Sequence, residues 1–190
     1  MLTERERKEI GRLWARKCDQ DARKLPQTER HRNLEPDSAE FICALAAGLR
    51  AKRLLEIGGS SGISTIALAA AAKETGGRLV SIEIEPARQA ESRSTIEGLD
   101  LAEQVEFVLD DAGEFLPRIR DAVDFVLIDC EKEDYARFFD LLPVVSGTVV
   151  VADNILSHGL TDYVAHVRSS RSAESVTLAI GKGLEVTRIR

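Results

Sequence analysis

The sequence predicts an α/β protein with a doubly wound, mostly parallel sheet. From residue 53 onward, short apolar runs rich in β-branched residues alternate with segments that have helical periodicity. A glycine-rich turn follows the first of these runs, and polar residues follow several later ones. Such alternation implies right-handed crossovers, which place helices on both faces of a parallel sheet.

Each strand is predicted from a short apolar run bounded by turn residues. The predicted strands span residues 53–57, 79–84, 104–109, 123–128, 147–152, 175–180 and 184–189. A Gly181-Lys182-Gly183 turn separates the last two runs. This turn predicts a hairpin in which the final strand runs antiparallel to its predecessor.

Two helices are predicted before the alternating part. Residues 3–24 form an amphipathic helix that begins with a capping box of Thr3 and Glu6. After a polar connector punctuated by prolines, Asp37 or Ser38 caps the second helix. The later helices are predicted over 63–73, 86–98, 112–117, 132–142 and 160–169. We therefore expect one domain over residues 1–190, with N-terminal helices in 1–50 and the core in 51–190.

Composition narrows the function classes. The net charge of −6 argues against general nucleic-acid binding, although residues 1–32 carry ten Lys/Arg and six Asp/Glu. Cys18, Cys43 and Cys130 lie far apart, which excludes a disulfide framework and a zinc motif. No apolar run reaches the roughly 18 residues that span a bilayer, and the N-terminus does not resemble a signal peptide. We expect a reduced, cytoplasmic setting without a membrane partner.

The first strand runs into a glycine-rich turn. Gly58 and Gly62 permit a close backbone approach to a ligand beside a helix N-terminus. Glu83, at the end of the second strand, is placed to accept hydrogen bonds from a ribose diol. The glycine spacing differs from G-x-G-x-x-G, and no Lys-Ser/Thr pair follows it, so a P-loop is excluded. These glycines alone also suit a tight corner without a ligand, but Glu83 favours nucleoside binding.

Polar residues follow two later strands. Asp129 comes directly after the 123–128 run, and Asp153-Asn154 follows the 147–152 run. Side chains at the carboxyl ends of parallel strands converge on one crevice. Two carboxylates and an amide form an all-oxygen ligand set, which suits a hard cation such as Mg²⁺. Asp153-Asn154 alone would also suit a simple turn, but Asp129 in the matching position favours a metal site.

Taken together, these motifs resemble the cation-dependent O-methyltransferases, a family that includes catechol and caffeoyl-coenzyme A O-methyltransferases and small bacterial relatives. The resemblance covers about residues 34–190. It rests on Leu54–Ser64, Glu83, Asp110-Asp111-Ala112, Asp129-x-x-Lys132-x-x-Tyr135, Asp153-Asn154 and Ile180-Gly181-Lys182-Gly183-Leu184. It implies a Rossmann-like class I methyltransferase sheet of seven strands, the last of them antiparallel.

The resemblance also implies roles for individual residues. Lys132 corresponds to the general base and Tyr135 to an aromatic anchor on the next helix. Asp129, Asp153 and Asn154 correspond to the ligands of a divalent cation, with Mg²⁺ as the first choice and Mn²⁺ or Ca²⁺ as alternatives. The residues expected to bind S-adenosylmethionine are Glu56, Gly58, Ser60, Gly62, Ser64, Glu83, Asp111, Ala112 and Asp129.

By this resemblance the protein is an O-methyltransferase that acts on a small catechol-like or phenolic acceptor, and it forms a homodimer. The segment after the metal pair is short, at 155–162, so the acceptor pocket is open or completed by a partner subunit. His158 in this segment is an ordinary loop histidine or an acceptor contact. The basic N-terminal residues form a solvated face or attract an anionic acceptor.

Three alternatives remain open. The acceptor is a hydroxylated uridine in transfer RNA, a hypothesis favoured only by the basic first helix. The chain is a non-catalytic nucleoside-binding relative, as the short acceptor segment suggests. An NAD-dependent dehydrogenase is disfavoured by the glycine spacing and by the unexplained Asp153-Asn154 pair.

Overall fold

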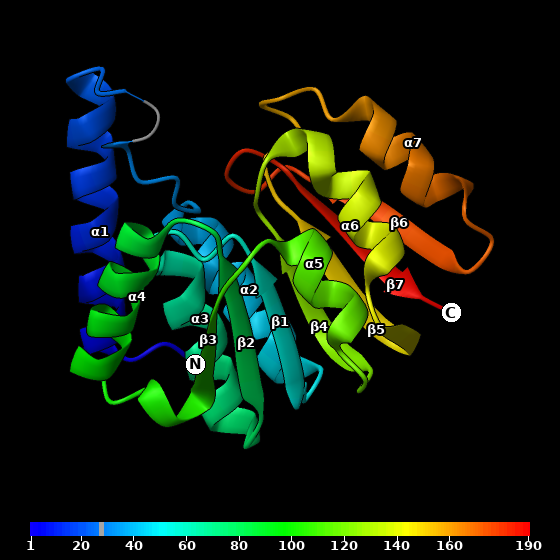
Figure 1. Cartoon of the computed structure of the whole chain (residues 1–190), viewed down its shortest axis with the longest axis horizontal. Helices are drawn as coiled ribbons and strands as arrows, with labels where there is room; N and C mark the ends of the chain where they lie inside the picture. The colour runs from blue at the N-terminus through cyan, green and yellow to red at the C-terminus, as the bar shows by residue number, and fades with distance from the viewer. Residues whose placement is uncertain (27–28) are drawn as a thin grey trace.

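Seven strands form a single sheet in the order β3-β2-β1-β4-β5-β7-β6, in a computed structural model that describes residues 1–26 and 29–190 (Figure 1). Strands β1 to β5 pair in parallel, whereas β7 is antiparallel to both β5 and β6. The predicted doubly wound sheet and its closing hairpin are therefore confirmed. The strands are β1 (Arg53–Ile57), β2 (Arg78–Glu83), β3 (Val105–Leu109), β4 (Val123–Ile128), β5 (Val144–Ala152), β6 (Ala173–Leu178) and β7 (Leu184–Ile189).

Helices cover both faces of this sheet, because each central strand sends apolar side chains alternately to the two sides. Phe125 and Leu127 belong to the core under α1 to α4, whereas Val126 and Ile128 belong to the core under α5 to α7. The helices are α1 (Glu4–Ala22), α2 (Pro36–Gly48), α3 (Ile63–Thr75), α4 (Pro86–Gly98), α5 (Ala112–Phe115), α6 (Tyr135–Leu141) and α7 (Thr161–Ser169).

The ends of the first two helices test the capping predictions. Thr3 and Glu6 form the predicted capping box at the start of α1. Helix α2 begins at Pro36, earlier than the predicted cap at Asp37 or Ser38, and Glu35 is its N-cap. Proline suits the first helical turn because its missing N–H would have no intrahelical partner there. Helix α1 lies beside α4 at one edge of the molecule, where Arg16 pairs with Glu91 at 2.5 Å (Figure 1).

Two elements near the site differ from the predicted ones. The helix predicted over 132–142 is a 3₁₀ turn over Lys132–Asp134 followed by α6, and Asp134 at the start of α6 makes no side-chain cap. Strand β5 begins at Val144 instead of 147, since a register shift between Val123 and Phe125 admits extra residues into the ladder. No helix among the described residues is long and apolar enough to cross a membrane.

Candidate functional site

The glycine turn after β1 approaches the end of β4 closely. Gly58 has φ +93°, and a Cβ atom there would collide with the backbone carbonyl of Asp129. Gly62 has φ +112° and caps α3, and its Cβ would lie 2.9 Å from Ser92 Oγ. Only glycine fits both the backbone conformation and the space at these positions. The turn therefore holds the β1 loop against the strand end that carries Asp129.

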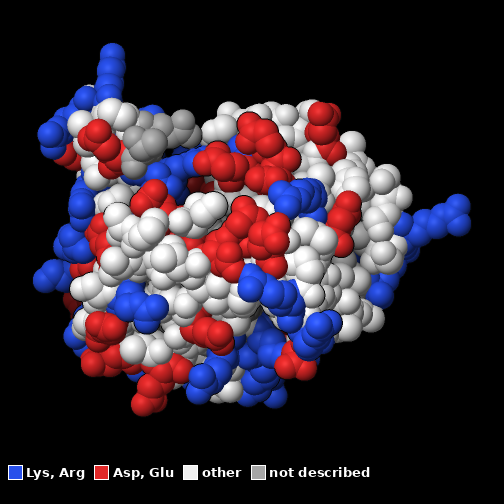
Figure 2. Space-filling model, in the orientation of Figure 1, with Lys and Arg blue, Asp and Glu red and all other residues white. Residues whose placement is uncertain are grey.

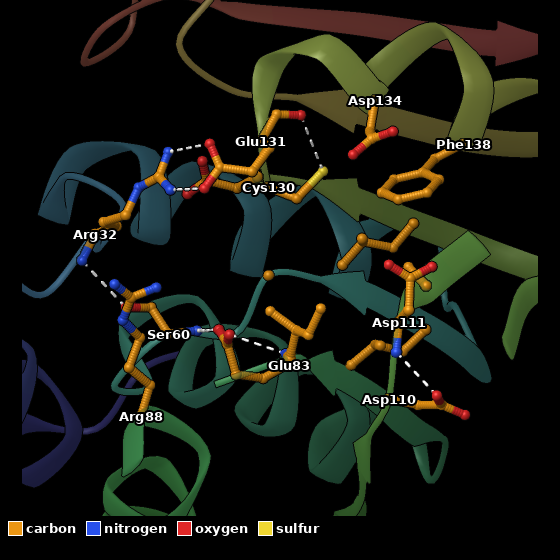
Figure 3. A pocket seen from close by; sticks show the side chains of 16 residues that line it. Arg32, Ser60, Glu83, Arg88, Asp110, Asp111, Cys130, Glu131, Asp134 and Phe138 are labelled. Carbon is orange, nitrogen blue, oxygen red and sulfur yellow. Dashed lines mark hydrogen bonds and ion pairs between the residues drawn. The ribbon is translucent and has the colours of Figure 1, made fainter. Parts of the chain in front are cut away.

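A cavity of about 110 Å³ opens above the ends of β1, β2 and β4, and we call it the acidic cavity (Figure 3). Two arginines, Arg32 and Arg88, also line it, and Ile57, Ile82 and Phe138 are among its apolar walls. Acidic side chains gather around the hollow on this face of the molecule (Figure 2). The six carboxylates of its lining are Glu83, Asp110, Asp111, Asp129, Glu131 and Asp134.

Glu83 is buried at the floor of the acidic cavity with its carboxylate held by the backbone. Oε2 accepts a hydrogen bond from the N–H of Ser60 at 2.8 Å. Oε1 accepts from the N–H groups of Ile84 and Glu85, at 3.0 and 2.9 Å. Oε2 accepts only one of these three bonds and retains a lone pair, so the group is orientated and still able to accept a hydrogen bond from a hydroxyl donor.

Asp111 lies across the acidic cavity from Glu83 (Figure 3), and Ala112, where α5 begins, also lines the cavity. Asp111 caps this short helix, and its Oδ1 accepts from the N–H of Gly113 at 2.7 Å. Ala112 contributes only a methyl group to the lining of the cavity.

Three of the nine residues predicted to bind the cofactor do not line the acidic cavity. Glu56 is fully buried beneath the glycine turn, where its Oε2 accepts hydrogen bonds from Thr65, at 2.7 Å, and from Ser81. Ser64 also hydrogen-bonds to Glu56, and Gly62 faces Ser92. Burial raises the pKa of Glu56. This placement does not bring Glu56 or Ser64 to the surface of the acidic cavity. Glu56 and its hydrogen-bond partners instead pack beneath the glycine turn and stabilise it.

The three predicted metal ligands converge at the ends of β4 and β5. The Nδ2 atom of Asn154 lies 2.8 Å from Asp129 Oδ1 and 2.8 Å from Asp153 Oδ2. The backbone ladder explains this arrangement, since the N–H of Asp129 donates to Ile57 and the N–H of Asp153 donates to Ile128. Asn154 has φ +64°, a left-handed conformation that asparagine tolerates better than most residues.

The charge balance of this cluster suits a cation. Asp129 pairs with Lys132 at 3.3 Å, whereas Asp153 makes no ion pair within the described residues. Asp153 Oδ1 is buried without a hydrogen-bond partner. Burial, together with the charge of Asp129, raises the pKa of Asp153 to about 8. Two buried carboxylates facing one ammonium group leave negative charge that a divalent cation would neutralise.

The cluster is small by the usual standard for protein metal sites. Across residues 1–26 and 29–190, no group of three or more His, Cys, Asp or Glu side chains is arranged to hold a metal. The set here is two carboxylates and one amide, and the amide nitrogen faces both carboxylates. Rotation of the Asn154 amide would exchange this nitrogen for its oxygen, and the two orientations differ only in hydrogen bonding. The donor set therefore fits a hard divalent cation.

Lys132 and Tyr135 lie together beside this cluster. Lys132 Nζ donates to the Tyr135 hydroxyl at 2.8 Å and faces Asp129 Oδ1 at 3.3 Å. Tyr135 is fully buried, and its ring packs edge-on against Tyr163 at a centroid distance of 5.5 Å. This packing anchors the tyrosine, which in turn orientates the lysine next to Asp129.

A second cavity, of about 300 Å³, lies on the other side of this lysine, and we call it the basic cavity. It shares Asp129 and Arg32 with the acidic cavity. Arg32 also forms an ion pair with Glu131 (Figure 3). The lining of the basic cavity consists of Lys17, Asp21, Arg30, His31, Arg32, Asn33, Asp129, Lys132, Asn154, His158 and Lys182.

Several cavity residues were not predicted as site residues. Arg32 comes from a polar connector whose sequence gives no signal of a ligand site. Asp134 and Phe138 are four positions apart on the chain segment that follows Asp129, so helical spacing would have placed them on one side of that segment. Lys182 was predicted only as a turn residue, yet it lines the basic cavity.

Comparisons with known proteins agree with this arrangement. A family model described as O-methyltransferase matches residues 18–186. Catechol O-methyltransferases from Mycobacterium tuberculosis and Niastella koreensis are each 32% identical to this chain, over 142 and 133 residues. The aligned parts cover 73% and 67% of this chain but 62% and 60% of those relatives. The chain thus spans roughly three fifths of the length of these two proteins.

A solved structure gives the same picture of the fold. The O-methyltransferase from Bacillus cereus, crystallised in complex with SAH, matches with a TM-score of 0.82 at 22% identity. The match covers 100% of this chain and 93% of that one. The sheet order, the glycine turn and the strand-end cavity define a Rossmann-like methyltransferase fold. The chain belongs to the O-methyltransferase family, which confirms the resemblance to cation-dependent members inferred from its motifs.

Proposed function

We propose that this protein transfers a methyl group from S-adenosylmethionine to a hydroxyl oxygen of a small acceptor, with a divalent cation as cofactor. The observation that carries this proposal is the meeting of two cavities at Asp129. One cavity has the floor and walls expected for a nucleoside, and the other contains Lys132 and Asn154. A donor in the first and an acceptor in the second would face each other across one carboxylate.

The acidic cavity is the proposed donor site. S-adenosylmethionine supplies a methyl group on a positively charged sulfonium. Glu83, orientated by three backbone N–H groups, accepts hydrogen bonds from the ribose hydroxyls. Asp111 and Ala112 border the adenine, and the turn at Gly58 and Ser60 approaches the methionine part. Glu56, Gly62 and Ser64 act through the turn, by holding it in this conformation.

Asp129, Asp153 and Asn154 are the proposed ligands of the divalent cation, with Mg²⁺ as the first choice. A cation there lowers the pKa of an acceptor hydroxyl and orientates its oxygen. The support is the unpaired, buried Oδ1 of Asp153 and the convergence of all three side chains within hydrogen-bond distance. Asp129 also lines the donor cavity, so the same residue aligns both reactants.

Lys132 Nζ is the proposed acceptor of the hydroxyl proton. Its side chain is largely buried, and Tyr135 holds its amine at 2.8 Å. As a general base, Lys132 would take up the proton that leaves the acceptor hydroxyl when the new O–CH3 bond forms. Alignment of oxygen, methyl carbon and sulfur supplies much of the remaining acceleration, without a covalent enzyme intermediate.

The whole chain is proposed to act as one domain, with the N-terminal helices as part of it. Helices α1 and α2 contribute to the same apolar core as α3. Residues from α1 and from its connector line the basic cavity, so the N-terminal segment is part of the acceptor side. The homodimer stays a prediction, and sedimentation analysis would test it. The transfer-RNA alternative gains no support from the relatives named above.

The decisive experiment is a methyl-transfer assay with S-adenosylmethionine and a panel of catechols, with Mg²⁺ and with a chelator. We expect turnover only in the presence of the metal, and methylation on oxygen. Metal-independent turnover would contradict the proposed role of Asp129, Asp153 and Asn154. Donor binding without turnover of any phenol would favour the non-catalytic alternative.

A further inference from the structure

The basic cavity differs from the pocket that an uncharged aromatic acceptor requires. Every described residue that lines it is polar or charged, so no apolar side chain is available to cover a ring. Its lining contains five Lys or Arg residues and two Asp residues. A divalent cation at the neighbouring cluster would add further positive charge.

The cations farthest from the proposed metal site come from segments outside the strand ends. Lys17 lies on α1, Arg30 on the connector and Lys182 on the turn between β6 and β7. Lys17 and Arg30 share a single carboxylate, Asp21, at 2.8 and 3.1 Å. Lys17 Nζ also lies 4.7 Å from the centroid of the Trp14 ring, but among the ion pairs of the described residues the two cations have only this one carboxylate.

Lys182, from the turn between β6 and β7, adds a third cation to the lining of the basic cavity. Its ammonium pairs with Glu35 at 2.8 Å, and about a third of its side chain is exposed. Glu35 itself lies outside the lining of the cavity, so the ammonium rather than the carboxylate faces the space. The turn brings this lysine close to the cluster because the N–H of Ile155 donates to Gly183, and the N–H of Leu156 donates to Lys182 itself.

We infer that the acceptor is a hydroxylated acid, whose carboxylate or phosphate binds among Lys17, Arg30 and Lys182 while its hydroxyl reaches Asp129 and Asn154. This inference rests on the proposed function and names its substrate class. An anion at this position would act as a second negative partner for Lys17 and Arg30, which share the single carboxylate of Asp21. It would also gain charge-assisted hydrogen bonds from Lys17, Arg30 and Lys182. An uncharged catechol gains none of these and finds no apolar wall.

Calorimetry in the presence of SAH and Mg²⁺ tests the class without requiring turnover. The probes are catechol, 3,4-dihydroxybenzoate, 3,4-dihydroxybenzyl phosphate and dopamine, which share the diol and differ in charge. We expect at least one of the two acids to bind about tenfold more tightly than catechol, and dopamine to bind most weakly. The stronger of the two acids identifies carboxylate or phosphate as the recognised group. Equal binding of acids, catechol and amine would overturn the inference.

Single substitutions test which cations of the basic cavity bind the acid group. Arg30→Gln and Lys182→Met should each weaken binding of the acid about tenfold while changing catechol affinity less than twofold. Lys8→Met removes an exposed cation from α1 outside the cavity, and it should change neither affinity. Unchanged binding of the acid in both cavity variants would refute the assignment.

A measurement on the unaltered protein guards against misfolded variants. Between about 0.05 and 0.5 M salt, affinity for the acid should fall while affinity for catechol stays constant, because salt screens charge pairs.

A short RNA hairpin that binds more tightly than the acids would replace the small-molecule inference with the transfer-RNA one. Binding of the acid without methyl transfer would support the anion site among Lys17, Arg30 and Lys182 and contradict the proposed function. Efficient methylation of catechol and dopamine without preference for acids would support the proposed function and refute the inference about the acid.

Discussion

The acidic cavity and the basic cavity meet at Asp129 but are built in different ways. The acidic cavity has six carboxylates and apolar walls, and most of its residues come from strand ends and from the turns that follow them. The basic cavity has five Lys or Arg residues and no apolar wall among the described residues, and much of its lining comes from α1, the connector and the last turn. The strand ends of the fold therefore shape the proposed donor cavity, whereas peripheral segments shape the proposed acceptor cavity.

The largest effect is expected at Asp129, the carboxylate that both cavities share. Asp129→Asn removes a charge from the metal cluster and from the donor cavity together, so kcat/KM should fall at least about 1,000-fold. Steady-state assays at saturating Mg²⁺ would measure this loss. Asp140→Asn, which alters an exposed carboxylate on α6 paired with His166, is the matched control and should retain activity. If Asp129→Asn keeps more than a tenth of the activity, the two cavities do not meet at the reacting atoms.

Substitutions of Lys132 and Lys182, two lysines of the basic cavity, should affect different kinetic constants. Lys132→Met should lower kcat by about 100- to 10,000-fold, since it removes the proposed proton acceptor, and should leave donor affinity unchanged. Lys182→Met should raise KM for an acidic acceptor with little effect on kcat. Steady-state kinetics together with calorimetry of S-adenosylmethionine would separate these effects. A collapse of donor affinity in Lys132→Met would show that this lysine supports the donor side instead.

A smaller effect, confined to the acidic cavity, is expected at Glu83. Glu83→Gln keeps the size of the side chain but replaces one acceptor oxygen with an NH2 donor that faces a backbone N–H group, so affinity for S-adenosylmethionine should fall at least about tenfold. Acceptor KM should stay constant because Glu83 does not line the basic cavity. Equal changes in both constants would mean that the two cavities are coupled.

The smallest effect concerns the support beneath the turn. Burial raises the pKa of Glu56 above its ordinary value near 4.5. The protonated acid therefore stabilises the fold at low pH, and this stabilisation is lost as the pH rises through the folded-state pKa. Relative to Glu56→Gln, the wild-type free energy of unfolding should fall as the pH rises above the ordinary glutamate pKa near 4.5 and through the raised pKa of the folded state. Chemical denaturation at several pH values measures the difference, and a constant difference would indicate that Glu56 ionises freely.

Much of the donor side was predictable because its signals are local. The β-branched runs, the glycines of the first turn and the polar residues after each strand specify a parallel sheet and the edge where side chains converge. Gly58, Glu83 and Asp129 could be placed in one crevice from strand order alone, and the structure brings them together there.

The sequence predicts the site less well where tertiary packing determines the direction of a side chain or the position of a connector. Glu56 lies in a strand that is buried on both faces, so the sequence pattern could not show whether its carboxylate faces the cavity or the helix beneath. Arg32 and Arg30 lie in a connector without periodicity, and only the folded structure brings them to Lys182, about 150 positions later in the chain. Periodicity also could not show the 3₁₀ turn at Lys132, because a missing cap leaves no positive signal.

The left-handed backbone of Asn154 has a consequence for engineering this protein. At φ +64°, glycine, asparagine and aspartate are the inexpensive choices, and among these only asparagine and aspartate carry an oxygen. A randomised library at this codon would thus sample one informative replacement, the aspartate, which adds a third negative charge. Attempts to change metal preference are better directed at Asp153, whose backbone has no positive φ and accepts a wider choice of side chains.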